Sequence, residues 1–346
     1  MACETVVIGL NWVGDNVLAL PTFKALQHRF RSEGGIAVAA PANVATLLEA
    51  TGIFKQVIAW RNRSMRHRIA TLRAGQFRRA IILPNSFRAA ALTLAAGIEE
   101  RWGYPTDWRR ILLTHPVAPP AKRGHQLDDY TPLLEALNAP RVVDDIPTIK
   151  LPHSIRERGR RRLLGVGLHM DRPILGIHPG GLYGRAKHWG DDAYIDVIKR
   201  LRSEGFDVVL LTSPREREQA ERIATTCNGV PMIGHDGDVL ELAAAISQCA
   251  AVITNDSGPL HVATALAVPS VSIFGPTDPE RTVIPGATRV VRRKHACQPC
   301  YQRECPLGTH ACMADVTVDE VFGAAVGIFA GTDALESPAG VHHFDA

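Results

Sequence analysis

Short apolar runs, many of them β-branched, alternate with longer stretches of helical spacing along the whole chain. In the first half, these runs predict strands at 5–10, 35–40, 56–60, 79–83 and 101–104. In the second half, they predict strands at 173–178, 207–212, 251–254 and 270–274. The strongest runs are continuously apolar, which is typical of parallel strands that helices cover on both faces. The pattern therefore predicts the α/β fold class, with parallel sheets.

A proline-rich segment at 140–152 separates the two halves. Its three prolines in thirteen residues leave no room for a long helix or strand. A chain of 346 residues also exceeds what one hydrophobic core usually serves. We therefore expect two Rossmann-like domains with doubly wound sheets, at 1–152 and 153–330. The second domain should contain a helix at 191–204, a cysteine-rich loop at 295–313 and a final helix at 318–329, followed by a frayed tail at 331–346.

The composition is that of a globular protein that can bury a full core, because 46% of residues are hydrophobic and 21% charged. The longest nearly apolar stretch, 89–98, is ten residues, and a membrane span needs about 20. No basic and then apolar leader opens the chain, so we expect it in the cytoplasm. The net charge of +4 is too small to indicate nucleic acid as a partner.

The positive charge is concentrated in one segment. Residues 50–98 contain no Asp or Glu and carry nine cations: Lys55, Arg61, Arg63, Arg66, Arg68, Arg73, Arg78, Arg79 and Arg88. One interpretation is a solvated helix face in an arginine-rich chain, which has 32 Arg and seven Lys. The other is a surface that meets phosphates and acidic sugars at a membrane face, because anionic surfaces attract basic residues by about 1 kcal/mol each.

Residues that directly follow the strands are the candidates for chemistry, because ligands of open α/β sheets bind at the carboxyl ends of the strands. The segment after the first strand, 11–16, matches neither a dinucleotide fingerprint nor a P-loop. Asp15 within it has two interpretations, a helix cap and a general base. In the same half, Asn85, Ser86 and Arg88 follow a strand and are candidates for binding an acceptor.

Two segments of the second half carry candidate residues for binding a sugar nucleotide or its diphosphate. Gly180, Gly181 and Lys187 fall in the loop 178–189, where glycines allow close backbone approach and a lysine beside a helix start suits a diphosphate. The alternative is a flexible loop with a solvated lysine. A second strand end feeds a helix and offers groups for a sugar nucleotide: Asp256, Ser257, Gly258 and His261. The alternative there is a capping side chain and a surface histidine.

Two further acidic features carry less weight. Glu218 is a weak candidate for a ribose contact, because most charges in the segment 213–218 are expected to be solvated. Asp236-Gly237-Asp238 matches the DxD pattern of metal-dependent transferases, but glycine at its centre favours a simple turn.

Four cysteines lie within sixteen residues: Cys297, Cys300, Cys305 and Cys312. Four thiolates suit a tetrahedral zinc ion, and a loop with little core of its own gains folding energy from a metal. Disulfides and an iron–sulfur cluster are the alternatives, although the spacing does not match the common ferredoxin run. In either metal case the role is expected to be structural.

Several of these segments together resemble a known family. They are NWVGD at 11–15, LPNSFRAA at 83–90, AGIEERWGY at 96–104, HPGGLYGRAKHW at 178–189, TNDSGPLHVATAL at 254–266 and FGPTDP at 274–279. In this order they resemble glycosyltransferase family 9, the ADP-heptose:lipopolysaccharide heptosyltransferases, and most of all its heptosyltransferase II branch. The resemblance spans nearly the whole chain.

The resemblance implies a GT-B fold, with two Rossmann-like domains facing a cleft and a last helix that returns to the amino-terminal domain. It implies that the first domain holds the acceptor and the second holds ADP-heptose, and that transfer is inverting and needs no metal or other cofactor. By position, Asp15 matches the catalytic base, Lys187 the diphosphate ligand and Glu218 the nucleoside contact. The loop for the sugar and phosphates matches Asp256, Ser257, Gly258 and His261.

The implied partners are ADP-heptose and a lipopolysaccharide inner-core acceptor, Kdo-lipid A that already bears a heptose. The implied location is the cytoplasmic face of the inner membrane, in peripheral contact with it. Two alternatives stay open: another family 9 enzyme with a different acceptor or donor, and a nucleotide-sugar epimerase of GT-B fold. An epimerase acts without an acceptor, so acceptor dependence discriminates between them.

Overall fold

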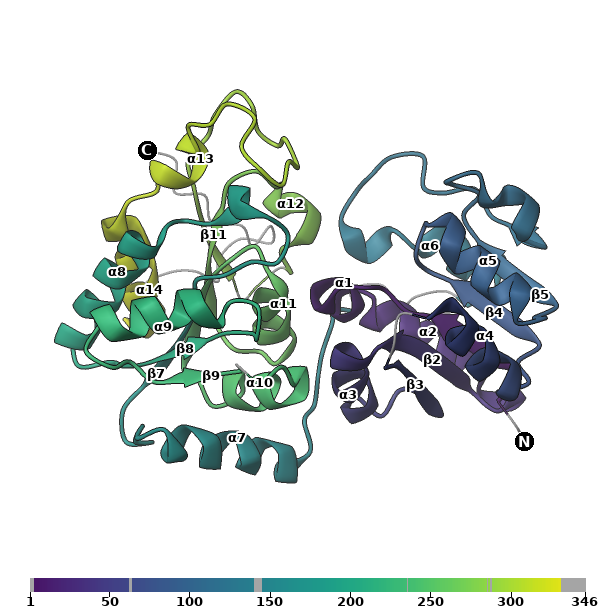
Figure 1. Ribbon diagram of the computed structural model, residues 1–346, viewed down its shortest axis with the longest axis horizontal. Coiled ribbons are helices and arrows are strands. Elements are labelled where there is room, and N and C mark those ends of the chain that lie inside the picture. Colours follow the sequence, from purple (N-terminus) through teal and green to yellow (C-terminus); the bar gives the residue numbers. More distant parts are fainter. Residues whose placement is uncertain are drawn as a thin grey trace. The chain divides into compact units, whose positions relative to one another are not determined.

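The computed structural model describes residues 3–61, 64–139, 145–234, 236–284, 286 and 288–330. The chain divides into two compact units, Met1–Pro147 and Thr148–Ala346 (Figure 1). The boundary lies five residues before the predicted one at 152. Residues 140–144 of the proline-rich segment and the tail at 331–346 fall outside the described residues.

The first unit is built on a six-stranded parallel sheet with the order β3-β2-β1-β4-β5-β6. The strands are β1 (Thr5–Ile8), β2 (Ile36–Pro41), β3 (Gln56–Trp60), β4 (Arg79–Ile82), β5 (Glu100–Gly103) and β6 (His115–Pro116). The helices are α1 (Val13–Leu18), α2 (Leu20–Arg29), α3 (Ala42–Ala50), α4 (Met65–Ala74), α5 (Phe87–Ala95) and α6 (Thr131–Ala136), and the 3₁₀ turns are η1 (Arg31–Glu33), η2 (Arg109–Leu112) and η3 (Gln126–Asp128).

The second unit repeats this plan, with the strand order β12-β11-β10-β7-β8-β9. The strands are β7 (Ile174–His178), β8 (Asp207–Leu211), β9 (Met232–Ile233), β10 (Ala251–Asn255), β11 (Ser270–Phe274) and β12 (Thr288–Arg292). The helical elements are α7 (His153–Gly165), η4 (Arg185–Lys187), α8 (Asp191–Ser203), α9 (Arg217–Thr226), α10 (Val239–Ile246), α11 (Gly258–Ala265), α12 (Pro279–Thr282), α13 (Ala311–Ala314) and α14 (Val318–Phe329).

In both sheets the strand order reverses beside the central strand, between β1 and β4 and between β7 and β10. Such a switch point opens a crevice at the carboxyl ends of the strands, where loops diverge to opposite faces. The central strands are apolar and fully enclosed, as Val6, Val7, Val252 and Ile253 show. The two doubly wound parallel sheets confirm the predicted α/β fold class and give each unit one rigid edge for a site.

All nine predicted strands are present, and their ends shift by two residues or fewer. The sequence analysis missed β6, β9 and β12. The first two are only two residues long and lie at sheet edges, so they leave no periodic pattern to detect.

The last helix, α14, has the predicted bounds and begins with a capping box formed by Thr317 and Glu320. This helix packs on α8 and on β10, β11 and β12 of its own unit, because Val321, Ala324 and Ala325 on its apolar face are buried in that core. The implied return of the chain to the amino-terminal domain stays a prediction.

Candidate active site

Asp15 lies in the first turn of α1, directly after the carboxyl end of β1. Its neighbour Asn16 is fully buried and fixes the preceding loop. The Asn16 side-chain oxygen accepts from the Leu10 N–H at 3.1 Å, and its amide donates to the carbonyls of Leu10 and Trp12 at 2.8 and 2.7 Å. The N-cap residue of α1 is Trp12, which makes no side-chain cap, and Asp15 is the acid in the first turn of this helix.

One oxygen of Asp15 has a specific partner that the sequence analysis missed. The Gln126 amide in η3 donates to Asp15 Oδ1 at 3.0 Å. Nearby, burial raises the pKa of the Tyr130 phenol, and the negative charges of Asp129 and Asp15 raise it further. The half-buried Asp15 carboxylate is therefore held in a defined orientation at the switch point of the first sheet, as a general base requires.

Arg109 holds together the loop that follows β4. Its side chain is completely buried, and its guanidinium donates to the carbonyls of Tyr104 at 2.7 Å, Ser86 at 3.3 Å and also Pro84. Burial lowers the pKa of Arg109 to about 10, although the charge of Asp107 opposes this. The sequence analysis missed it because one arginine among many carries no distinguishing pattern.

The candidate acceptor residues lie on this loop at the surface. Asn85, Ser86 and Arg88 are all exposed. The Ser86 hydroxyl accepts from the Ala89 N–H at 3.3 Å and so caps α5. The Asn85 side-chain oxygen accepts from Arg109 at 3.5 Å. Ser86 thus has a structural function as well as an accessible position.

In the second unit, Lys187 and Asp256 form a buried ion pair. The Lys187 ammonium lies 2.6 Å from Asp256 Oδ2 and also donates to the Asp256 carbonyl at 3.1 Å. Thr277 donates to the same carboxylate oxygen at 2.8 Å, and His261 Nε2 lies 3.8 Å from the other. The structure therefore brings Lys187 of one predicted segment together with Asp256 and His261 of another.

The electrostatics of this cluster favour the charged form of Asp256. Burial of Asp256 opposes ionisation, but the Lys187 and His261 charges and the hydrogen bonds from Lys187 and Thr277 outweigh it and lower the pKa of the carboxyl. Ser257 and Gly258 begin α11 directly beside the pair, as N-cap and first residue. A helix start with amide groups next to a lysine is an arrangement that binds phosphate.

Ser257 belongs to a second polar chain, whose other members the sequence analysis missed. Its hydroxyl lies 3.2 Å from His178 Nδ1 and 2.9 Å from the Thr254 hydroxyl. On the other side of the ring, His178 Nε2 lies 3.4 Å from Glu216 Oε2, which also accepts from Ser213 at 2.5 Å. Hydrogen bonds between buried groups thus link the ends of β7, β8 and β10.

Gly180 lies against this chain for a steric reason. A Cβ at Gly180 would be 2.2 Å from Glu216 Oε1, closer than any side chain tolerates. A Cβ at Gly181 would meet nothing nearer than 3.8 Å. Of the two predicted glycines, only Gly180 is therefore required by packing against a neighbouring side chain, and that neighbour is the acid two residues before the predicted Glu218.

Glu218 itself is on the surface. Its carboxylate is 92% exposed and lies 3.3 Å from Arg222 in the next turn of α9. It lines a charged pocket of about 590 Å³. The walls come from η4, the starts of α8 and α9 and the cysteine-rich loop, and they include Arg185, His188, Arg215, Glu218, Glu304 and His310. The position of Glu218 in a pocket is consistent with a ligand contact.

Acid denaturation is expected to reveal the Glu216 contribution to stability. Burial alone would raise its pKa, but the His178 charge and the hydrogen bonds from His178 and Ser213 lower it to about 2, from 4.5. The ionised form therefore stabilises the fold fully above pH 4.5, and this contribution is lost as the pH falls from there towards 2. The shift corresponds to about 3 kcal/mol.

Urea unfolding at pH 7, 4 and 3 measures this effect. The difference in the free energy of unfolding between wild type and Glu216→Gln should become smaller as the pH falls. Glu218→Gln, which changes an exposed acid on the same helix, should follow the wild type. A gap that stays constant across these pH values would show that Glu216 has an ordinary pKa.

The acidic tripeptide is a turn, as expected. Gly237 has a φ of +85°, Asp238 caps α10 by accepting from the Leu240 N–H at 2.9 Å, and Asp236 pairs with Arg162. Both carboxylates are therefore engaged in holding α10 and α7.

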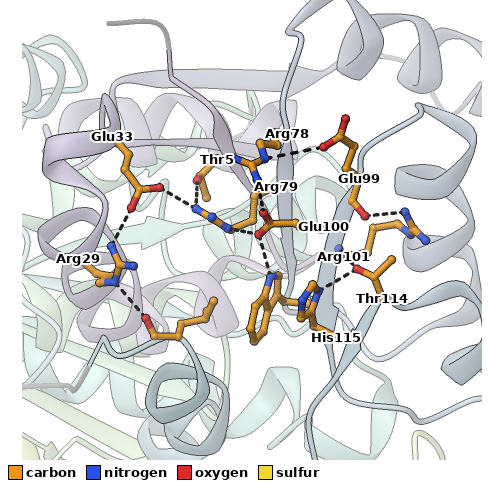
Figure 2. A network of polar contacts seen from close by, with 12 residues as sticks. Thr5, Arg29, Glu33, Arg78, Arg79, Glu99, Glu100, Arg101, Thr114 and His115 are labelled. Atoms are coloured by element: carbon orange, nitrogen blue, oxygen red, sulfur yellow. Dashed lines mark hydrogen bonds and ion pairs between the residues drawn. The ribbon is translucent and has the colours of Figure 1, made fainter.

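The basic segment is partly neutralised by acids just outside it (Figure 2). Arg79 pairs with Glu33 at 2.9 Å and with Glu100 at 2.7 Å, and Arg78 lies 3.4 Å from Glu100. On α4, Arg66 and Arg73 are exposed, which fits a solvated helix face. Arg63 falls outside the described residues. The net positive charge of this part of the surface is therefore smaller than the count of nine cations suggests.

The predicted zinc site of the cysteine-rich loop stays a prediction. All four thiols are free, so the disulfide alternative is not met. Among the described residues, no three His, Cys, Asp or Glu side chains are arranged to hold a metal ion. Burial and then the charges of Cys297, Cys300 and Cys305 raise the pKa of Cys312 to about 11.

This loop also supports the lysine of the site. The Ala186 N–H donates to the Arg303 carbonyl at 3.0 Å, and a Cβ at Gly184 would be 2.3 Å from that carbonyl oxygen. Backbone N–H groups, first that of His310, lower the pKa of the Cys305 thiol. The loop is therefore folded against η4, which carries Lys187.

Comparison with known proteins assigns the family. Residues 65–311 match glycosyltransferase family 9 (heptosyltransferase). The chain belongs to this family. It is 28% identical over 338 residues to lipopolysaccharide heptosyltransferase 2 of Salmonella typhimurium strain LT2 and 29% over 339 residues to that of Escherichia coli K12, in each case over 92% of this chain and 96% of the relative.

Solved structures of the family agree. The structure of E. coli ADP-heptose lps heptosyltransferase II has a TM-score of 0.78 and 25% identity, covering 95% of this chain and 99% of that one. A family 9 glycosyltransferase from Veillonella parvula shares the fold, with a TM-score of 0.80, 19% identity, and coverage of 95% and 98%. The protein is therefore a family 9 glycosyltransferase with a GT-B-like fold.

In the part of the chain that the structure describes, no helix is long and apolar enough to span a bilayer.

Proposed function

We propose that this glycosyltransferase transfers heptose from ADP-L-glycero-D-manno-heptose to the inner core of lipopolysaccharide, as a heptosyltransferase II. The supporting observation is the similarity over 92% of the chain to two lipopolysaccharide heptosyltransferase 2 enzymes. The proposed donor groups are Gly180, Gly181, Lys187, Glu218, Asp256, Ser257, Gly258 and His261 in the second unit. The proposed acceptor groups are Asn85, Ser86 and Arg88 in the first.

In the proposed reaction, Asp15 is the general base. The acceptor hydroxyl oxygen attacks the anomeric carbon of the heptose, the bond from that carbon to the phosphate oxygen breaks, and its electron pair leaves with ADP. Asp15 takes the hydroxyl proton, with Gln126 holding its Oδ1. Attack opposite the leaving group inverts the anomeric configuration. General-base catalysis of this kind contributes about 10²- to 10⁴-fold.

The leaving ADP is stabilised by groups of the chain in place of a metal. Lys187 supplies positive charge, and α11 begins at Ser257 and Gly258, directly after Asp256, the ion-pair partner of Lys187. In the free protein Lys187 is held by Asp256, so the ammonium is already in position before the donor binds. We therefore expect the reaction to proceed in the presence of EDTA.

Transfer assays with a panel of acceptors test this function. Purified protein is incubated with ADP-heptose and Kdo-lipid A that carries zero, one or two heptoses, and released ADP and product mass are followed. The expected result is ADP release with the acceptor that bears one heptose. Transfer to another acceptor indicates a different family 9 specificity. Conversion of the nucleotide sugar without any acceptor indicates an epimerase.

We propose in addition that Cys297, Cys300, Cys305 and Cys312 hold one structural metal ion. The support is the donor set, since four thiolates within sixteen residues suit tetrahedral Zn²⁺ or iron, together with the contact of the loop with η4. The metal would hold the loop that carries Arg303 and would take no part in transfer.

Elemental analysis of protein purified without chelator tests the metal. About one equivalent of zinc or iron is expected, together with a lower melting temperature after chelation. The Cys312→Ser variant should lose the metal, whereas Cys249→Ser, at a buried thiol of the same unit, should retain it. Less than half an equivalent in the wild type would refute the proposal.

A further inference from the structure

The turn η2 displays large apolar side chains to solvent. Trp108 is 91% exposed and Ile111 is 85% exposed. The turn packs on α5, where Phe87 and Leu94 are also exposed. Single exposed apolar residues are common, but a group of large ones on two packed elements indicates an interaction surface. We refer to Phe87, Leu94, Trp108 and Ile111 as the Trp108 surface.

The protein holds this surface rigidly. Arg109, between the two most exposed residues, is completely buried and bonded to the backbone of the loop after β4. Asp107 Oδ2 accepts from the Phe87 N–H at 2.6 Å, and the Thr106 hydroxyl donates to the Asn85 carbonyl at 3.1 Å. The turn is therefore fastened to the start of α5 by its own polar groups.

The backbone shows a further sign that the exposure of Trp108 is built in. Asp107 and Trp108 have φ values of +53° and +57°, in the left-handed region that residues other than glycine rarely adopt. This conformation directs one residue into a cap and the next outwards. The exposed Trp108 ring adds almost no packing contact that would compensate for the strain of this turn. This favours a function for the ring outside the fold.

Two exposed cations lie on the elements that carry the Trp108 surface. Arg88 and Arg110 are exposed on the same two elements, and the stretch 50–98 that includes α5 has no acidic residue. Asp107, which precedes Trp108 in the chain, accepts a hydrogen bond from the Phe87 N–H at the start of α5. Tryptophan prefers the interface between lipid and water, and arginines are attracted to anionic headgroups.

We propose that the Trp108 surface, with Arg88 and Arg110, docks this enzyme on an anionic lipid bilayer. The inference extends the proposed function, because an acceptor of the lipid A type is anchored in a bilayer. Arg109 links the surface directly to the loop of Asn85 and Ser86. Docking through η2 and α5 therefore brings the candidate acceptor residues to the headgroup region, where the acceptor sugar is found.

Vesicle binding by the full-length protein tests the surface. The probes are vesicles of phosphatidylethanolamine and phosphatidylglycerol, with pure phosphatidylcholine vesicles as the neutral reference. Wild type should bind the anionic vesicles, and less so at high salt. The double variant Trp108→Ala/Ile111→Ala should bind at least about tenfold more weakly because it loses most of the exposed apolar area.

The matched control is Leu307→Ala, which removes a 65% exposed apolar side chain from the second unit and should bind as wild type does. Because Trp108 and Ile111 are exposed, the melting temperature of the double variant should be unchanged. Its heptose transfer to acceptor embedded in vesicles should fall, whereas transfer to a deacylated, water-soluble acceptor should be that of wild type.

Two results would overturn the proposal: vesicle binding that the double substitution leaves unchanged, and a wild-type protein that dimerises through this surface and ignores vesicles. Failure of the proposed function is distinguishable, because it would abolish transfer to both acceptors in the wild type and leave vesicle binding intact.

Discussion

Replacement of Asp15 by asparagine is expected to lower kcat by about 10²- to 10⁴-fold while the Kd for ADP-heptose changes little. Asparagine has the same shape, and its oxygen can still accept from Gln126, which lies 3.0 Å from Asp15 Oδ1. Only the capacity to take a proton is lost. Steady-state kinetics with saturating acceptor, and donor binding by calorimetry, measure the two quantities separately.

The matched control is Asp145→Asn, which changes a half-buried acid of the same unit that lies 3.2 Å from Lys24. It should retain wild-type kcat. An Asp15→Asn enzyme with undiminished turnover would remove Asp15 from the chemistry. A large loss of donor affinity with constant kcat would instead make it a binding residue.

Lys187→Met is expected to give the second largest effect, a loss of about 10²- to 10³-fold in kcat/KM. The same change leaves the buried Asp256 without the ammonium at 2.6 Å, and an unpaired buried charge destabilises a fold by about 3–5 kcal/mol. Activity and stability should therefore fall together in this variant, and a second variant is needed to separate them.

The double variant Lys187→Met/Asp256→Asn removes both charges of the pair. Its melting temperature should recover most of the way to that of wild type, because no buried charge is left unpaired. Its activity should not recover, because the positive charge for the leaving diphosphate is still absent. Recovery of activity along with stability would show that the pair is only structural.

The fold could be predicted because its central strands are continuous apolar runs. Val6 to Ile8 and Val252 to Thr254 are enclosed by helices on both faces, and such strands leave the same pattern in any sequence. The edge strands β6 and β9 left no such pattern. For the last helix, the sequence analysis relied on the resemblance alone. Its packing depends on contacts distant in sequence, because Val321 is buried in the core of the second unit.

Site residues could be predicted where they directly follow a strand, because ligands of open α/β sheets bind at the carboxyl ends of the strands. Lys187 and Asp256 were found in loops that follow β7 and β10, and the two loops meet because these strands are neighbours in the sheet. Residues that support the site through contacts distant in sequence were not found. Gln126 reaches Asp15 across 111 residues, and Glu216 reaches His178 across 38.

The basic segment shows why a count of charges along a sequence misleads. The parallel register of β4 and β5 places Arg79 directly opposite Glu100, and Glu33 approaches the same guanidinium from η1 (Figure 2). Sequence distance hides both acids. The exposed cations that matter for a membrane are those beside apolar groups, and only the structure identifies Arg88 and Arg110 as such.

The anomeric configuration of the product, formed in the presence of EDTA and read by NMR, tests the central claim most directly. The heptose of the product should have the configuration opposite to that of the donor, at a rate that EDTA leaves unchanged. Retained configuration, or a reaction that stops when divalent metal is removed, would contradict a single displacement with Asp15 as base and Lys187 as the charge on the leaving group.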